Sequence, residues 1–302
     1  MTQSDARTYL ATAVRAALPA ADAIMRIYEE GNWDVEEKAD KSPLTRADRE
    51  AHDVIVEVLE RETRDVPILS EEGAHLPFET RRGWKRLWVV DPLDGTKEFL
   101  SRNGEFTVNV ALVEDGAPVL GVVAVPALDT WYVAASGGGA YRASREELDA
   151  AVTAAEPIAN LATRAARLEA GGARGADAGP GAETAAAGPP GAARIVASRS
   201  HLNAETEAFI EKLRGRHGEV ELVQAGSAVK LCRVAEGAAD YYPRLAPTME
   251  WDTGAGDAVV REAGGRVLQA AADGTSDGTP LVYNKEDLHN PYFVAVTRNT
   301  TI

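Results

Sequence analysis

The stretch "RLWVVDPLDGTKEFL", residues 86–100, decides the fold of this chain and locates its chemistry. The apolar run Leu87–Val90 predicts a buried strand, and two carboxylates, Asp91 and Asp94, follow it with a Pro-Leu pair between them. Burying two carboxylates side by side is unfavourable unless a countercharge accompanies them. Divalent cations supply such a charge, and ligand sets made only of oxygen favour Mg²⁺, Mn²⁺ or Ca²⁺ over zinc. The sequence therefore predicts a strand whose carboxyl end binds cations.

Further acids stand at comparable positions. Glu71 ends another expected strand, and Asp252 is expected as the N-cap of a helix. Asp94 is also expected as an N-cap, and the backbone amides of Gly95 and Thr96 at that helix start would suit a phosphate. Aspartate caps helices for stability alone, however. Each acid taken singly predicts a cap or a solvated turn, and only the joint pattern predicts a site.

Composition limits the classes of protein that fit. The chain has 302 residues, of which 45% are hydrophobic and 26% charged, as in globular proteins, and its formal charge is −15. This charge argues against nonspecific binding to nucleic acid or to an anionic membrane. The single cysteine, Cys232, excludes an intrachain disulfide and suits a reducing compartment. Because neither a signal peptide nor a run of roughly 18 apolar residues is present, we expect a cytoplasmic protein without a membrane span.

The chain is expected to divide into two halves joined by a low-complexity segment. Residues 1–150 predict an α+β half that carries the acidic motifs, with an antiparallel hairpin at Asp115-Gly116. Residues 151–191 are rich in alanine, glycine and proline, which predicts a surface insertion or linker. Residues 192–302 alternate between helix and strand patterns, which predicts an α/β half. A ligand cleft is expected between the halves.

Taken together, the motifs resemble those of a known family. Glu71-Glu72, "DPLDGT" at 91–96 and "WDTGAGDAV" at 251–259 resemble the inositol monophosphatase-like superfamily of Mg²⁺-dependent, lithium-sensitive phosphatases. "DPLDGTKEF" at 91–99 and "GSAVKLCRVAEG" at 226–237 are similar to its 3′(2′),5′-bisphosphate nucleotidase branch of the bacterial CysQ type. The resemblance covers nearly all of the chain outside 151–191. It implies an α/β fold, a layered α-β-α-β-α sandwich of two halves.

The resemblance also implies a set of metal ligands and catalytic residues. The implied metal ligands are Glu71, Asp91, the Leu93 carbonyl, Asp94 and Asp252. They would hold two Mg²⁺ ions, with Asp91 bridging, and a third, weaker ion would lie near Asp48 and Glu71. Thr96, hydrogen-bonded to Asp48, resembles the pair that orients and deprotonates the attacking water. Glu71 would take part in catalysis through the metal.

A second implied set binds the substrate. It consists of Gly95, Thr96, Ser198, His201, Ser227, Lys230 and Arg244. Lys230 and Arg244 are suitable charge-assisted donors for the phosphate that is not cleaved. From the residues alone, His201 fits a surface histidine equally well. Lys230 alone fits a solvated charge on a helix better, and only the motif around it indicates a substrate role.

The activity implied by the resemblance is removal of the 3′-phosphate of adenosine 3′,5′-bisphosphate, giving AMP and phosphate. The sulfated relative, 3′-phosphoadenylyl sulfate, is a second expected substrate, which would place the enzyme in sulfur metabolism. Two alternatives stay open at this point. One is the same chemistry on inositol phosphates or fructose 1,6-bisphosphate, and the other is an inactive, metal-dependent binding protein. The expected partner is a small phosphorylated nucleotide rather than nucleic acid, and the family suggests a homodimer.

Overall fold

The structure is a computed structural model that describes residues 2–38, 43–74, 76–153, 166–170, 192–197 and 202–302. Its α-helices are α1 (Gln3–Glu30), α2 (Arg46–Glu62), α3 (Phe78–Arg81), α4 (Thr96–Leu100), α5 (Arg145–Thr153), α6 (Ala204–His217), α7 (Val229–Ala235) and α8 (Glu250–Glu262). A short 3₁₀ helix, η1, spans Pro126–Leu128. None of the helices in the described part of the chain combines the length and the apolar character needed to cross a bilayer.

The first half of the chain forms a seven-stranded sheet in the order β3-β4-β5-β6-β7-β8-β9. Its strands are β3 (Ile68–Ser70), β4 (Arg86–Asp94), β5 (Thr107–Glu114), β6 (Ala117–Val125), β7 (Thr130–Ala135), β8 (Gly139–Ala143) and β9 (Ala166–Arg167). All neighbours are antiparallel except β3 and β4. The expected hairpin is confirmed, because Asp115 and Gly116 join β5 to β6 with φ values of 49° and 78°.

The second half forms a five-stranded mixed sheet in the order β11-β10-β12-β14-β13. Its strands are β10 (Ala193–Ala197), β11 (Val220–Gln224), β12 (Tyr241–Arg244), β13 (Arg266–Gln269) and β14 (Phe293–Val296). Strands β10, β11 and β12 run parallel, while β14 pairs antiparallel with β12 and β13. A separate two-stranded hairpin joins β1 (Glu36–Glu37) to β2 (Pro43–Leu44).

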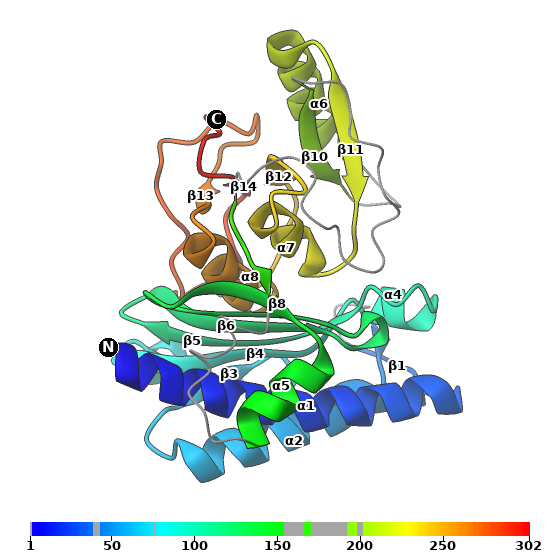
Figure 1. Ribbon diagram of the computed structural model, residues 1–302, viewed down its shortest axis with the longest axis vertical. Coiled ribbons are helices and arrows are strands. Elements are labelled where there is room, and N and C mark those ends of the chain that lie inside the picture. Colours follow the sequence, from blue (N-terminus) through cyan, green and yellow to red (C-terminus); the bar gives the residue numbers. More distant parts are fainter. Residues whose placement is uncertain (1, 39–42, 75, 154–165, 171–191, 198–201) are drawn as a thin grey trace.

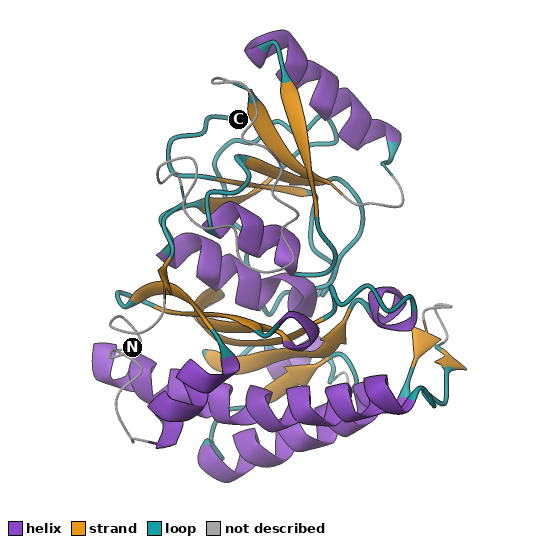
Figure 2. Ribbon diagram, turned by 45° about the vertical axis from the view of Figure 1, so that its right-hand side comes forward, coloured by secondary structure: helices purple, strands orange, loops and turns teal. Residues whose placement is uncertain are grey.

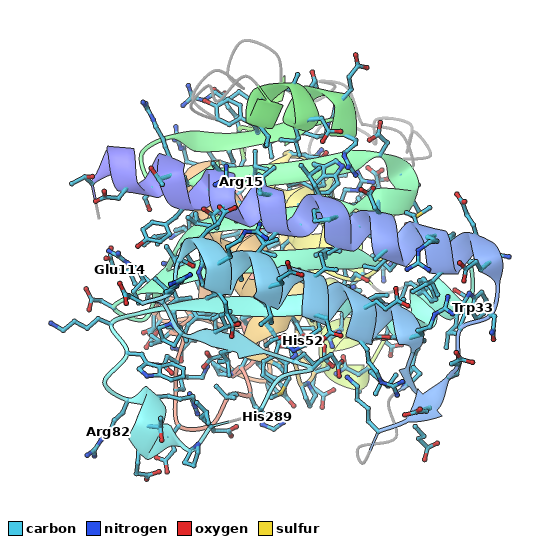
Figure 3. The ribbon with its side chains drawn as sticks, turned by 90° about the horizontal axis from the view of Figure 1, so that it is seen from below. Arg15, Trp33, His52, Arg82, Glu114 and His289 are labelled. Carbon is cyan, nitrogen blue, oxygen red and sulfur yellow. The ribbon has the colours of Figure 1, made fainter. Side chains whose placement is uncertain are left out.

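The elements stack in the expected α-β-α-β-α order. Helices α1, α2 and α5 cover the outer face of the first sheet, α7 and α8 lie between the two sheets, and α6 covers the second sheet (Figures 1 and 2). On the outer layer, Arg15 of α1 forms an ion pair with Glu62 of α2 at 2.6 Å, and Figure 3 shows Arg15 on this face. The layered fold is therefore confirmed.

Strand β4 lies between two helical layers and is buried on both faces. Trp88 and Val90 belong to the core shared with α1 and α2, whereas Leu87 and Val89 belong to the core shared with α7 and α8. Side chains of successive strand residues point to opposite faces, so a strand between two helical layers must be apolar throughout. This explains the uninterrupted run before Asp91 and fixes the carboxyl end of β4 between the two halves.

Part of the segment 151–191 belongs to the folded body. Strand β9 adds to the edge of β8, Leu168 and Ala170 are buried, and the Ala170 amide donates to the Ala263 carbonyl at 2.8 Å. The alanine-, glycine- and proline-rich residues 171–191, together with 154–165, lie outside the described residues. The division of the chain into two halves and an insertion stays a prediction.

Candidate active site

A bulge in β4 places Asp91 and Asp94 on the same side of the sheet. In a regular strand, residues three positions apart point to opposite faces. Here Asp91 pairs with Asn109 and Asp94 with Thr107, so three steps along β4 match only two along β5. The extra residue resets the alternation of side chains. The Leu93 amide donates to Asp91 Oδ1 at 3.1 Å, and Thr107 Oγ1 donates to Asp94 Oδ2 at 3.4 Å.

The positions expected for two helix caps are wrong. Strand β4 continues through Asp94 because it still pairs with β5 there, and Gly95, with a φ of 88°, is the N-cap of α4. Helix α8 begins before Asp252, at Glu250, with Met249 as its N-cap. The Asp252 carboxylate accepts the Met249 amide at 2.8 Å, so it stabilises the helix start from the third helical position.

Three carboxylates from β4 and α8 converge. Asp91, Asp94 and Asp252 each offer an oxygen, and these oxygens lie within 4.8 Å of one another. Asp91 is buried, and the other two are half-buried. Within the described ranges, no lysine or arginine forms an ion pair with any of the three. The cluster is an all-oxygen donor set without an ion-pair partner among the described residues, although the more distant charges of Lys230 and Arg244 lower the pKa values of Asp94 and Asp252. Such a donor set fits a hard divalent cation.

The electrostatics of the cluster agree with this arrangement. Burial raises the pKa of Asp94 to about 6 and the pKa of Asp252 to about 7. Burial also raises the pKa of Asp91 well above its ordinary value, and the charges of Glu71, Asp94 and Asp252 raise it further. The ionised cluster is therefore unfavourable by itself, and a bound cation would stabilise it.

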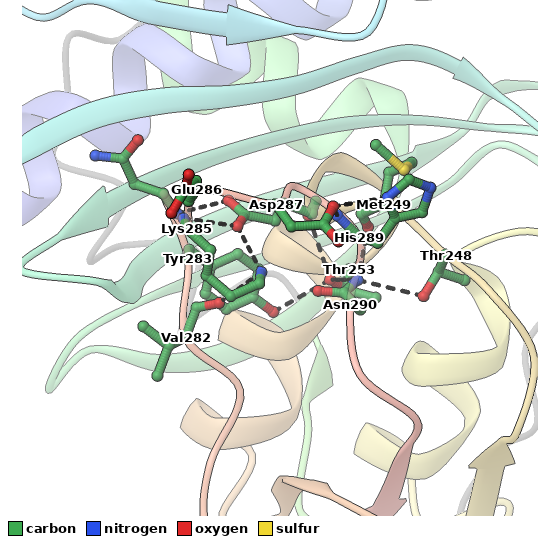
Figure 4. A network of polar contacts seen from close by, with 12 residues as sticks. Thr248, Met249, Thr253, Val282, Tyr283, Lys285, Glu286, Asp287, His289 and Asn290 are labelled. Atoms are coloured by element: carbon green, nitrogen blue, oxygen red, sulfur yellow. Dashed lines mark hydrogen bonds and ion pairs between the residues drawn. The ribbon is translucent and has the colours of Figure 1, made fainter. Parts of the chain in front are cut away.

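Two other acids of α8, Glu250 and Asp257, are buried and paired within the chain. Figure 4 labels a partner of each, Lys285 and Tyr283. Glu250 accepts hydrogen bonds from the Lys285 amide at 3.0 Å and from Lys285 Nζ at 2.5 Å. Asp257 accepts two from Arg261, at 2.6 and 2.9 Å, and one from the Tyr283 hydroxyl at 2.9 Å. Both acids are matched by a cation from the chain itself, unlike Asp252.

Glu71 lies beside the cluster but is engaged by a lysine. Its amide donates to the Val90 carbonyl at 3.1 Å, and its side chain is close enough to Asp91 to raise the pKa of that aspartate. Lys38 Nζ lies 2.7 Å from Glu71 Oε1 and also pairs with Glu72. Sequence reasoning missed Lys38. The signal available was a lysine in "KADKSPLTRAD" together with two consecutive glutamates that need a partner.

The structure places Thr96 beside Asp48, as the resemblance implies. Asp48 is 2% exposed, and its Oδ2 accepts the Thr45 amide at 2.7 Å and the Thr45 hydroxyl at 2.6 Å. Its Oδ1 lies 3.5 Å from Thr96 Oγ1. Burial raises the pKa of Asp48 to about 6, although the hydrogen bonds from Thr45 oppose this shift. Asp48 thus joins the start of α2 to the turn that carries Asp94.

Two cations from the second half line a cavity next to the cluster. Lys230 is 9% exposed, and its Nζ lies 6.0 Å from the centroid of the Tyr242 ring. Arg244 donates to the Pro247 carbonyl at 3.0 Å, and its buried Nε has no partner among the described residues. No described carboxylate forms an ion pair with either cation. They share a cavity of about 320 Å³ whose lining includes Leu202, Asn203, Thr206 and Tyr242.

The remaining expected residues differ in their outcome. Ser227 Oγ donates to the Asp94 carbonyl at 3.0 Å, so the structure places it at the acidic turn. Ser198 and His201 lie outside the described residues, and their role stays a prediction. Asn109, which pairs with Asp91 across β5, is buried and has no described partner for either side-chain atom. Sequence reasoning missed Asn109, although an amide within the apolar run "FTVNVAL" was a usable signal.

Comparison with known proteins decides which family has this geometry. A sequence profile described as the inositol monophosphatase family matches residues 5–298. The chain belongs to the inositol monophosphatase family. This is a family of metal-dependent phosphatases, and the resemblance identified from the sequence is confirmed.

Relatives within the inositol monophosphatase family include enzymes named 3′(2′),5′-bisphosphate nucleotidase CysQ. One from Escherichia coli is 42% identical over 276 residues, which cover 91% of this chain and 94% of that protein. The crystal structure of CysQ from Bacteroides thetaiotaomicron has 45% sequence identity and a TM-score of 0.79, covering 97% of this chain and 98% of that one. The suhB protein from Bartonella henselae, at 24% identity and a TM-score of 0.67 over 95% and 92% of the chains, shares the fold.

Proposed function

We propose that this chain is a Mg²⁺-dependent 3′(2′),5′-bisphosphate nucleotidase that hydrolyses the 3′-phosphate of adenosine 3′,5′-bisphosphate to AMP and phosphate. The observation that carries the proposal is the juxtaposition of an acidic cluster with two cations, Lys230 and Arg244, none of which forms an ion pair at contact distance among the described residues. A bisphosphate offers one phosphate to each. The CysQ names of close relatives support the choice of substrate. By the same reasoning, 3′-phosphoadenylyl sulfate is a second substrate, and the activity belongs to sulfur metabolism in the cytoplasm.

The residues proposed to hold the metal are Glu71, Asp91, the Leu93 carbonyl, Asp94 and Asp252. Their oxygen-only chemistry fits Mg²⁺, and a bridging Asp91 would allow two ions, with Asp48 near a third. When bound, such ions neutralise phosphate charge and assist the attack of water in an in-line displacement. The ion pair between Lys38 and Glu71 would have to loosen for Glu71 to serve as a ligand.

The proposed catalytic residues of the chain itself are Thr96 and Asp48. The Thr96 hydroxyl, held toward Asp48 Oδ1, would accept a hydrogen bond from the attacking water and orient it. Asp48, with a pKa raised by burial to about 6, is suited to take up a proton near neutral pH. The water oxygen forms a bond to phosphorus as the P–O bond to the ribose oxygen breaks. The ribose oxygen takes up a proton from solvent, which balances the proton that the water gives up. The amides of Gly95 and Thr96 are proposed to bind the cleaved phosphate.

Lys230 and Arg244 are proposed to bind the phosphate that is not cleaved. Both line the cavity next to Asp94, and Tyr242 forms part of its wall. Replacing Arg244 removes a charge-assisted hydrogen bond worth roughly 1.5–3 kcal/mol, which is about tenfold to over a hundredfold in kcat/KM. An inositol monophosphate or 3′-AMP has no second phosphate and should lose much less. The test is therefore a comparison of substrates rather than a single activity.

We would measure kcat/KM for adenosine 3′,5′-bisphosphate, 3′-AMP, inositol 1-phosphate and fructose 1,6-bisphosphate in the wild type and in Arg244→Ala. Arg214→Ala is the matched control, because Arg214 is exposed on α6 and pairs only with its neighbour Glu211 in the described structure. A selective loss on the nucleoside bisphosphate supports the proposal. Equal losses on all substrates, or a wild type that prefers the inositol or fructose compound, would overturn it. The absence of Mg²⁺-dependent phosphate release would favour an inactive binding protein.

Homodimerisation stays a separate proposal, testable by light scattering.

A further inference from the structure

One peptide group at the start of α8 links Asn290 to the acidic cluster. The Met249 amide donates to the Asp252 carboxylate at 2.8 Å. The carbonyl of the same peptide group, that of Thr248, accepts the Asn290 amide at 2.8 Å. A trans peptide directs its N–H and its C=O in opposite directions, so this group lies between Asn290 and Asp252 and is held from both sides. The position of the Asp252 carboxylate therefore depends on where Asn290 lies.

The side chain of Asn290 supports the same turn from a buried position. Asn290 is 7% exposed, and its Nδ2 donates to the Met249 carbonyl at 2.7 Å and to Thr253 Oγ1 at 3.0 Å (Figure 4). These two residues stand on either side of Asp252 in the sequence. The Asn290 Oδ1 atom, by contrast, is buried without a hydrogen-bond partner among the described residues. A buried acceptor left unpaired costs free energy, so this side chain contributes through its donors.

The segment that carries Asn290 is anchored to the first half of the chain. Arg81 of α3 is 3% exposed, and its Nη1 donates to Asn284 Oδ1 at 2.9 Å and to the Lys285 carbonyl at 3.1 Å. The backbone amides of Asn284 and Lys285 in turn donate to the Glu250 carboxylate at 2.6 and 3.0 Å. The segment 284–290 therefore connects the start of α8 to the half of the molecule that carries the two aspartates of β4.

We propose that Asn290 is a positioning residue of the cation site. Its side chain, held between the Met249 carbonyl and the Thr253 hydroxyl, fixes the first turn of α8 so that Asp252 meets the two aspartates of β4. Asn290 acts through Asp252 rather than on the cation or the substrate. The inference rests on the proposed function only in taking the acidic cluster as the Mg²⁺ site. Replacing residues that orient metal ligands through hydrogen bonds typically weakens metal binding by roughly tenfold to a hundredfold.

The test compares Mg²⁺ affinity with stability. Asn290→Ala removes the amide, and Thr253→Val removes the hydroxyl on the other side of the contact while keeping the shape of the side chain. Thr12→Val is the matched control, because Thr12 is also a buried helical threonine, at 2% exposure. Its hydroxyl lies 3.3 Å from the Thr8 carbonyl and 3.0 Å from the Glu62 carboxylate, in the outer helical layer.

Two quantities are measured for the wild type and each variant. The Mg²⁺ dissociation constant comes from isothermal titration calorimetry without substrate, on protein freed of metal, and the free energy of unfolding comes from urea titration in EDTA. We expect the dissociation constant to rise about tenfold in Asn290→Ala and about fivefold in Thr253→Val. In Thr12→Val it should stay within about twofold, even where the loss of stability equals that of Thr253→Val.

Wild-type Mg²⁺ affinity in Asn290→Ala and Thr253→Val would overturn the proposal, whatever the stability of these variants. An equal loss of affinity in Thr12→Val would also overturn it, because affinity would then follow stability alone. If Asn290→Ala fails to fold, Thr253→Val decides the question, because its shape is conserved. A wild type that does not bind Mg²⁺ would overturn the proposed cation site together with this inference. A wild type that binds Mg²⁺ but fails the substrate comparison would overturn the nucleotidase proposal alone.

Discussion

Helix α8 carries carboxylates of two kinds, and the difference between Asp257, in its middle, and Asp252, in its first turn, indicates what each is for. Asp257 is fully buried and is held by Arg261 and the Tyr283 hydroxyl. Asp252, in the first turn, faces Asp91 and Asp94 instead. The chain pairs Asp257 with its own arginine but brings three aspartates together without an ion-pair partner among the described residues. This difference indicates that the cluster binds a cation from solution. The first arrangement stabilises the fold, and the second stabilises a complex.

The largest effect that would test this difference is on turnover. Asp94→Asn keeps the shape of the side chain and removes a charge from the cluster, so we expect phosphate release to fall by roughly a hundredfold or more while the fold persists. The metal-free variant should be no less stable than the wild type, because repulsion with Asp91 and Asp252 is relieved. Phosphate release at limiting Mg²⁺ and urea unfolding in EDTA measure the two quantities. Near-normal turnover at limiting Mg²⁺ would remove Asp94 from the site.

The opposite effect is expected at Asp257, in the middle of the helix. Asp257→Asn leaves the Arg261 guanidinium without its carboxylate, and breaking such a buried pair destabilises a protein by several kcal/mol. Because the Arg261 side chain is 28% exposed, water offsets part of this loss. We expect about 2 kcal/mol in urea unfolding, with turnover per folded molecule within about twofold. Asp252→Asn is the matched control. If Asp252→Asn destabilised the metal-free chain more than Asp257→Asn, the distinction between these two carboxylates would be wrong.

The smallest effect is a pH dependence of stability. In the metal-free chain, the pKa values of Asp94 (about 6) and Asp252 (about 7) lie above their ordinary 3.8, so the folded state binds more protons than the unfolded state between these values. The contribution of the cluster to stability is therefore favourable below this window and is lost as pH rises through it. The difference in unfolding free energy between the wild type and Asp94→Asn, followed in EDTA from pH 4 to pH 8, isolates this contribution.

Saturating Mg²⁺ should reverse this slope, because cation binding favours the ionised carboxylates. A difference between wild type and Asp94→Asn that does not change with pH in EDTA would contradict the raised pKa values. A slope in EDTA that Mg²⁺ leaves unaltered would contradict binding of the cation at the cluster.

Much of the fold and the identity of the acids could be predicted from sequence, because both depend on residues that lie close together in the chain. The apolar run before Asp91 predicted β4, and the Asp115-Gly116 pair predicted the hairpin between β5 and β6; both are observed. The placement of Asp94 at a helix cap was wrong because the bulge in β4 arises from pairing with β5, which the string "DPLD" does not encode. The contact between the Ser227 hydroxyl and the Asp94 carbonyl could not be predicted either, since the two residues lie far apart in the sequence.

The meeting of β4 and α8 also has a kinetic consequence. The cluster exists only when Asp252, late in the chain, has docked against a strand that is itself shared by two cores. Closing a loop of this length makes such contacts late events in folding. An ion that binds only the completed site stabilises the native state and leaves the folding transition state untouched. Added Mg²⁺ should accordingly slow unfolding in a stopped-flow experiment and leave the refolding rates unchanged.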